Sequence, residues 1–305
     1  MERIVSIAET VLPVFLALIL GAWCRGKNFL TRDGIDSLKK VVINLTLPFV
    51  LLNAFATAEY SLSALILPAL IFLLCCLALG LGWLIVGKKS RLQPFLATGF
   101  EAGMLGYALF AMLFPEESIS RFAILDLGQT LFVFTLFKIL LSGKKDIKAI
   151  GKDMVTSPIL WAVAAGVLLG ATGLYGLLQQ WGVSGILDSA TSFLSAPTAM
   201  IILLTVGYDL VIKEIPWKKT AGLIAMRLIV MAVLMIIVVV LNRTVLDGMI
   251  FEGAALLMFI LPPPYVIPVF ADEPAERVQI SAALSAMTLA TMVLFAVCSV
   301  VIGFL

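Results

Sequence analysis

Two glutamates stand inside long apolar stretches of the chain, where an ionisable side chain is costly. Glu101 and Glu252 are each followed within two residues by a glycine, and they lie 151 residues apart in a chain of 305 residues. A carboxylate near the bilayer centre costs about 2.5 to 3.5 kcal/mol on insertion scales, so it normally faces a cavity and marks an ion or substrate path. The spacing indicates an internal repeat of about half the chain. We expect Glu101 and Glu252 to bind a coupling cation, either H⁺ or Na⁺. If the cation is Na⁺, its site would be at these two carboxylates.

Two further polar residues lie one helical turn apart in the next apolar stretch. Asp126 and Gln129 share one face of a helix, because residues three apart project to the same side. We expect them to complete an ion or proton site with Glu101, since consecutive membrane helices are usually neighbours. A structural hydrogen bond between helices is the alternative interpretation.

Two residues are candidates for contact with a substrate. Asn44 precedes Pro48 in an apolar stretch, where it either lines a cavity or joins two helices through a hydrogen bond. Arg227 also lies inside an apolar stretch. It either pairs with an anionic substrate or an intramembrane acid, or extends toward the membrane interface.

Three consecutive prolines predict a broken helix in the second half of the chain. Pro262, Pro263 and Pro264 precede Tyr265, and each proline lacks an N–H and clashes with the preceding turn. Broken backbone at membrane depth is tolerated where it is buried in protein or lines a wet cavity. The first half has glycines instead, which permit unwinding without requiring it. These glycines surround Glu101 at positions Gly99, Gly103 and Gly106.

The composition is that of a polytopic membrane protein. Hydrophobic residues make up 62% and charged residues 13% of the chain, and the mean hydropathy is +1.12, whereas soluble domains are about 25% charged. The absence of histidine excludes histidine metal sites, Ser-His-Asp triads and histidine relays. The positive charges are spread over short connections, so no nucleic-acid surface is predicted. We expect a protein in contact with the lipid bilayer that is not an enzyme, and the four cysteines show no metal-ligand spacing.

Ten apolar stretches are long enough to cross a bilayer, which requires roughly 20 residues each. We expect the first to be a retained membrane helix rather than a signal peptide. The ten stretches are 4–24, 38–57, 62–87, 93–114, 118–141, 155–174, 185–208, 219–241, 249–270 and 279–304.

The distribution of Lys and Arg predicts the orientation. The odd-numbered connections carry 16 of these residues and the even-numbered connections carry 2, which places the odd connections in the cytoplasm and both termini outside. Five crossings per half is an odd number, so the second half would be inserted upside down relative to the first. We therefore predict an all-α integral membrane protein of ten transmembrane helices as a 5+5 inverted repeat, with residues 1–142 and 154–305 as its halves and with broken fourth and ninth helices.

The pattern resembles the bacterial branch of the auxin efflux carrier family, within the larger group that includes bile-acid sodium symporters. The resemblance covers nearly the whole chain, and its individual motifs are short. They are Asn44-x-x-Leu47-Pro48, Asp126-Leu127-Gly128-Gln129, Ser195-Ala196-Pro197 followed by Gly207, and the proline-rich ninth stretch.

The resemblance implies a scaffold of spans 1, 2, 6 and 7 and a transport unit of spans 3–5 and 8–10, in which the broken helices cross. Mapped onto this chain, the crossing falls near 103–107 and 262–265. The residues expected to contact substrate are then Gly103, Met104, Gly106, Tyr107, Pro262, Pro263, Pro264 and Tyr265, together with Asn44 and Arg227. Members of the family typically carry Asn and Pro at the fourth-span break, where this chain has Met104-Leu105-Gly106-Tyr107. The run from Glu101 to Met104 is closer to the ion-binding helix of the sodium-coupled relatives.

These observations predict a secondary active transporter of a small organic anion, of carboxylate type, in the cytoplasmic membrane. Transport would follow an elevator-like alternating-access mechanism coupled to H⁺ or Na⁺, and a homodimer is compatible with scaffold packing. The alternatives are a Na⁺-coupled symporter of bile-acid type, and a non-transporting membrane sensor or assembly protein.

Overall fold

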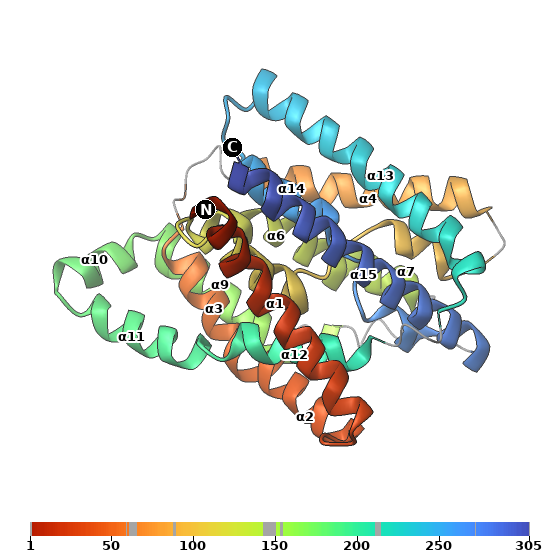
Figure 1. Ribbon diagram of the computed structural model, residues 1–305. Helices are drawn as coiled ribbons and strands as arrows, with labels where there is room; N and C mark the ends of the chain where they lie inside the picture. Colours follow the sequence, from red (N-terminus) through yellow and green to blue (C-terminus); the bar gives the residue numbers. More distant parts are fainter. Residues whose placement is uncertain are drawn as a thin grey trace.

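The computed structural model describes residues 2–58, 60, 66–87, 90–142, 151–152, 155–210, 215–271 and 273–304 (Figure 1). Throughout these ranges the regular structure is helical, with no strand. The helices are α1 (Glu2–Gly26), α2 (Arg32–Val41), α3 (Leu47–Ala56), α4 (Ile66–Val86), α5 (Tyr107–Leu113), α6 (Ile119–Phe132), α7 (Lys138–Leu141), α9 (Pro158–Ala171), α10 (Leu174–Gln180), α11 (Ser184–Ser195), α12 (Thr198–Asp209), α13 (Trp217–Thr244), α14 (Glu252–Ile260) and α15 (Pro274–Phe304).

Shorter helical turns continue or prepare several of these helices. Three are π-helical, and they join α2 to α3, lead into α5, and join α6 to α7. Two are 3-10 helices beside the interrupted fourth and ninth stretches. They are η1 (Val42–Thr46), η4 (Ala102–Gly106) and η5 (Val133–Phe137) of the first kind, and η3 (Gln93–Ala97) and η7 (Ile267–Phe270) of the second.

Seven described helices are long and apolar enough to cross a membrane, and α9 with α10 makes an eighth if this pair, bent by 65°, is one crossing. The prediction of an all-α membrane protein is confirmed at this level. The described residues do not show all ten predicted crossings: the fourth and ninth stretches are interrupted, as the sequence led us to expect, and neither contains a helix long enough to count as a crossing. The segments 88–89, 143–150 and 211–214, which contribute to the predicted orientation and include most of the connection between the predicted halves, lie outside the described residues.

Glycines allow the closest helix contacts. A Cβ atom on Gly21 of α1 would lie 2.0 Å from the Leu204 carbonyl oxygen, and one on Gly207 of α12 would lie 2.1 Å from the Leu18 carbonyl oxygen. The backbones of α1 and α12 therefore touch from both sides, and the two helices lie side by side in Figure 1. Small residues at such crossings are typical of membrane helices, whose association depends on close packing rather than on burial from water.

The two ends of the chain lie on the same side of the molecule. A Cβ atom on Gly303, near the end of α15, would lie 2.6 Å from the Ile7 side chain at the start of α1, and Figure 1 shows the N and C labels close together.

Arg91 joins segments that are far apart in the sequence. It donates to the carbonyl oxygens of Leu141 (3.1 Å) and Phe270 (2.6 Å). The ends of the fifth and ninth apolar stretches are thereby bound to the connection between the third and the fourth.

We predict that Gly207→Leu lowers the thermal stability of the purified protein in detergent. The added side chain would overlap the α1 backbone, and overpacking typically costs about 1–3 kcal/mol. The matched control is Gly222→Leu on α13, where a Cβ atom would meet nothing within 4 Å. An equal melting temperature for the two variants would contradict the close contact between α1 and α12.

Candidate functional site

The fourth and ninth apolar stretches are each interrupted by a non-helical segment, and these two segments contact each other. In the first, residues 98–101 are non-helical and separate η3 from η4, and in the second, residues 261–266 separate α14 from η7. The Glu101 N–H donates to the Pro262 carbonyl oxygen at 2.8 Å, which joins the two breaks directly. The predicted break at the three prolines is present.

The first break lies before the segment 103–107 to which the resemblance assigned it. Gly103 to Tyr107 are helical, and the chain changes direction at Gly99, whose φ of +67° is in the left-handed region. A Cβ atom on Gly99 would lie 2.8 Å from Pro264 Cγ. The position of this break follows from the close approach of the proline segment, which glycine alone permits.

Glu101 links the two broken segments through its carboxylate. Oε1 accepts a hydrogen bond from the Met104 N–H at 3.1 Å, and Oε2 accepts one from the Tyr265 N–H at 2.6 Å. The carboxylate thus caps the helix that begins at Ala102 and also holds the turn after the prolines. Negative charge at a helix N-terminus is favourable because the first N–H groups lack backbone partners. The side chain is half-buried.

Arg227 of α13 holds the carbonyl oxygens of the same breaks. Its Nη2 donates to Gly99 and Leu261, both at 2.8 Å, and its Nη1 donates to Leu96 at 3.2 Å and Thr98 at 3.4 Å. The residue is 3% exposed. It does not extend toward the interface, which was one of the two sequence interpretations, because its donors are used inside the protein.

Asp126 and Gln129 form a buried polar cluster with Tyr107. The Tyr107 hydroxyl donates to Asp126 Oδ2 at 2.8 Å, and Gln129 Nε2 donates to Asp126 Oδ1 at 3.2 Å and to the Phe100 carbonyl oxygen at 3.0 Å. The cluster therefore contacts the backbone next to Glu101. Gln129 Oε1 is buried without a hydrogen-bond partner among the described residues.

α15 supports the second break from behind. The Tyr265 and Thr288 hydroxyls lie 2.9 Å apart, and the Thr291 hydroxyl donates to the Ile260 carbonyl oxygen at 2.6 Å. Ile260 is the last residue of α14, so Thr291 binds a carbonyl group that the helix end leaves free. Tyr265 is thereby fixed on its backbone by Glu101 and on its side chain by α15.

A cavity of about 370 Å³ lies beside the cluster. It is bounded by α3 and by the junction of α11 with α12 on one side, and by α5 and the start of α6 on the other. Of the predicted substrate residues, Tyr107 alone lines it. The described residues of its walls carry hydroxyl and amide groups and no charged side chain. The lining residues are Val50, Asn53, Ala54, Thr57, Tyr107, Ala108, Ala111, Ser118, Ile119, Ser120, Ser195, Ala196, Thr198 and Ala199.

Sequence reasoning did not select the serines and threonines of this cavity. Ser118, Ser120, Ser195 and Thr198 lie at helix ends, where such residues are common for capping alone. The nearest signal was the Ser195-Ala196-Pro197 motif, which marks the junction between α11 and α12.

Two predicted residues lie in different surroundings. Glu252 is the first residue of α14 and accepts from Arg243 at 2.9 and 2.8 Å, and the Arg243 side chain is 68% exposed. Asn44 is exposed, and its amide donates to the Lys40 carbonyl oxygen at 2.9 Å. The contacts of Glu252 and Glu101 do not converge, so these residues do not fit a Na⁺ site shared by both carboxylates.

The remaining predicted residues contribute to packing. Gly106 lies against Leu261 and Phe122, with a Cβ atom 2.8 Å from each side chain if one were present. Gly103 lies near Leu47, at 3.4 Å by the same measure. Met104 is half-buried and packs against the hydrophobic core.

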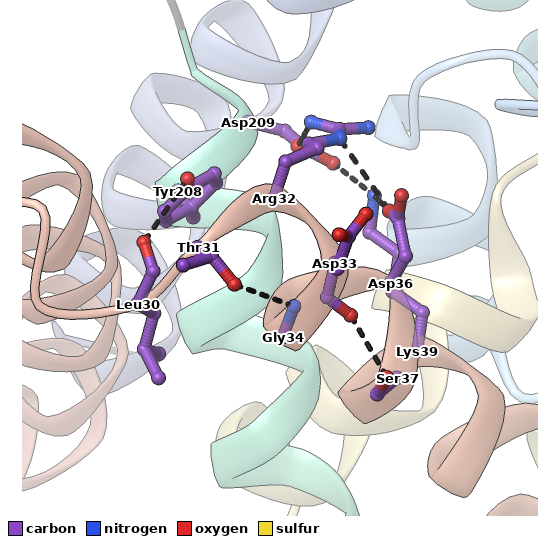
Figure 2. A network of polar contacts seen from close by, with 10 residues as sticks. All are labelled: Leu30, Thr31, Arg32, Asp33, Gly34, Asp36, Ser37, Lys39, Tyr208 and Asp209. Atoms are coloured by element: carbon purple, nitrogen blue, oxygen red, sulfur yellow. Dashed lines mark hydrogen bonds and ion pairs between the residues drawn. The ribbon is translucent and has the colours of Figure 1, made fainter.

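A second polar cluster joins α2 to the end of α12 (Figure 2). Arg32 Nη1 donates to Asp209 Oδ1 at 2.6 Å, and Lys39 is ion-paired with Asp209 Oδ2. Asp36 lies between the two basic residues, at 3.5 Å from Arg32 and 4.0 Å from Lys39. Asp209 was not selected from the sequence, since its partners are about 170 residues away along the chain.

No protein-family model matches the chain. It is 27% identical over 213 residues to an uncharacterized transporter of Methanothermobacter thermautotrophicus, covering 66% of this chain and 67% of that protein. It is also 27% identical over 231 residues to an uncharacterized transporter of Methanocaldococcus jannaschii, covering 71% of this chain and 73% of that protein. These relatives and the multi-span helical structure support a membrane transporter and are consistent with a protein that is not an enzyme. They do not specify the auxin efflux carrier family, which stays a prediction.

We predict that Asp209→Asn weakens the link between α2 and α12 in a salt-dependent way. Partly exposed ion pairs contribute roughly 0.2–1 kcal/mol each and are screened by salt. The melting temperature of the variant should fall below that of the parent at low ionic strength, and the difference should shrink in 1 M salt by roughly half or more. Asp33→Asn is the control, because the Asp33 carboxylate forms none of the described ion pairs. A salt-independent loss would assign Asp209 to packing instead.

Proposed function

We propose that this protein is a secondary active transporter that moves a small organic anion of carboxylate type across the cytoplasmic membrane, coupled to H⁺ or Na⁺. The observation that carries the proposal is the pair of broken, touching helices with the half-buried Glu101 between them. Irregular backbone at membrane depth is found where it is enclosed by protein or lines a substrate or ion path. The transporter relatives support the same class of function.

The helix packing supports an elevator-like mechanism with two units. α1 packs on α12, and α3 packs on α9 and α11, which corresponds to the proposed scaffold of spans 1, 2, 6 and 7. The proposed transport unit contains α4, α5, α6, α13, α14 and α15 with the two breaks. These elements pack mainly on one another, while α5 also contacts α1 and α12, and α15 also contacts α1. In this proposal the interrupted fourth and ninth stretches also cross the membrane, which gives ten crossings in two inverted halves.

The cavity is the proposed substrate site because it lies between these units. α3 and α12 bound it from the scaffold, whereas Tyr107 and the start of α6 bound it from the transport unit. A displacement of one unit against the other would change which side of the membrane the cavity faces. Its volume of about 370 Å³ is at the lower end of ligand pockets, which span about 300–1,000 Å³, and suits a small substrate.

The polar groups of the cavity favour an anion over a cation. α12 begins at its wall with Thr198 and Ala199, and no side chain caps the first N–H groups of this helix. Uncapped N–H groups and the helix dipole attract carboxylate or phosphate groups. Among the described residues no carboxylate lines the cavity, so these walls offer an anionic substrate hydroxyl and N–H donors without like-charge repulsion.

Coupling is assigned to Glu101, with Asp126 and Gln129 as its neighbours. The Tyr107 hydroxyl both lines the cavity and donates to Asp126, and Gln129 continues the contact to the backbone beside Glu101. A hydrogen-bonded path therefore leads from the proposed substrate site to the Phe100 carbonyl group, which is the backbone next to the proposed coupling residue Glu101. A change of protonation or ion binding at Glu101 would alter the N–H groups that it holds in both breaks.

A thermal-shift screen of carboxylates, in Na⁺ and in Na⁺-free buffer at two pH values, would identify the substrate. Flux of the best ligand into proteoliposomes would then be measured under an imposed proton or sodium gradient. We predict that Glu101→Gln abolishes the stimulation of flux by the gradient, since the side chain loses its charge and its exchangeable proton. Site coupling of 1–3 kcal/mol corresponds to an effect of about 5- to 150-fold.

Glu252→Gln is the matched control, because its carboxylate is ion-paired with Arg243 at an exposed helix start. This variant should keep the gradient dependence of the parent. Normal folding and parental gradient dependence of Glu101→Gln would contradict the coupling role. Flux without any proton or sodium dependence in the parent would indicate a uniporter.

We predict that Ala199→Phe blocks transport while the protein stays folded. The aromatic ring would fill part of the cavity, and flux should fall by roughly tenfold or more if a substrate of this size must enter. Met200→Phe is the control, because Met200 is the next residue of α12 and is 53% exposed. Unchanged affinity and flux in Ala199→Phe would place the substrate elsewhere.

A further inference from the structure

The two breaks leave a set of backbone carbonyl groups that need a cationic partner. Residues 98–101 are outside regular helix, and the prolines that follow Leu261 have no N–H to offer. Carbonyl oxygens of both segments converge in the protein interior, where unpaired acceptors are costly because no water replaces the lost partner. The four that meet are those of Leu96, Thr98, Gly99 and Leu261.

All four carbonyl oxygens accept from one guanidinium group. Arg227 reaches them at 2.8 to 3.4 Å, and the Phe100 ring centroid lies 5.6 Å from its Cζ. None of the described ion pairs includes Arg227. Its charge is balanced here by carbonyl dipoles and an aromatic face, which is the environment that proteins otherwise give to a dehydrated monovalent cation.

We infer that Arg227 is a covalently tethered cation that fills a carbonyl cage at the helix crossing, in the place where a free monovalent ion would otherwise be needed. A guanidinium group suits this role because it keeps its charge at every physiological pH and presents five donors in a fixed plane. The cage links the breaks of both halves through α13. Since the ion is part of the chain, it cannot dissociate during a transport cycle.

The consequence for coupling is that the crossing needs no Na⁺ of its own. Glu101 already accepts two N–H bonds and Glu252 is bound to Arg243, while the carbonyl oxygens are held by Arg227. A proton at Glu101 is then the coupling ion that this arrangement favours. This consequence rests on the proposed transport function, whereas the cage itself does not.

The cage is tested by chemical rescue of Arg227→Ala, measured as thermal unfolding of the purified full-length protein. In choline chloride we expect the melting temperature to fall by roughly 5 °C or more, since removing one partner of a buried polar network is strongly destabilising. Guanidinium chloride at low millimolar concentration, NaCl or KCl should restore roughly half of the loss or more by occupying the vacated cage. Arg243→Ala on the same helix is the control, and no cation should change its melting temperature. Destabilisation of Arg227→Ala without recovery in any of the three salts would overturn the proposal.

A second pair of variants covers the case in which Arg227→Ala does not fold. Arg227→Lys keeps a tethered cation, whereas Arg227→Met keeps similar length without charge. The Lys variant should remain closer to the parent in melting temperature and in yield of monodisperse protein. Equal losses in the Lys and Met variants would show that charge in the cage is unimportant and would overturn the inference.

Flux measurements separate the cage from the transport function. Parental flux should persist when Na⁺ is replaced by choline, and Arg227→Ala should transport only when one of the rescuing cations is present. A requirement of the parent for Na⁺ would overturn the coupling consequence. Failure to transport any carboxylate would contradict the proposed function. The thermal rescue would still test whether Arg227 fills a carbonyl cage, because it does not depend on transport.

Discussion

The structure depends on how it satisfies the backbone groups that two helix breaks release inside the protein. Carbonyl oxygens of the breaks are bound by Arg227, and N–H groups of the breaks are bound by the carboxylate of Glu101. One cationic side chain thus binds the free carbonyl oxygens, and one carboxylate binds the free N–H groups. Water would bind such groups at the surface of a protein. The direct bond from Glu101 to Pro262 completes the crossing.

Neighbouring helices and a buried polar cluster hold this crossing in place. α13 supplies Arg227 from one side, and α15 supplies the hydroxyl groups that hold Tyr265 and the end of α14. On another side the cluster of Asp126, Gln129 and Tyr107 reaches the cavity. Arg227 is enclosed, whereas Glu101 is half-buried. The proposed exchange of a proton or an ion is accordingly assigned to Glu101, the less deeply enclosed member of the charged pair.

Much of the fold was predictable because its signals are local. Hydropathy alone located the long helices, and the three prolines located the second break, since proline disrupts a helix whatever surrounds it. The first break was placed several residues too late. Its position depends on Gly99 lying against Pro264, a contact between segments about 165 residues apart that no local pattern records. Likewise, the sequence left open whether Glu252 belongs to an ion site or lies near the membrane interface, because its pairing with Arg243 depends on how the chain folds.

The sequence by itself determined a helical membrane protein with costly charges inside apolar stretches. It also determined that a helix breaks at 262–264. The tertiary structure decided which partners those charges have, because the partners of a buried polar group are chosen by proximity in space: Arg227 binds carbonyl groups 131 and 34 residues away in sequence. It also decided where the cavity lies, since its walls come from helix ends whose serines and threonines look like ordinary caps until they face one another.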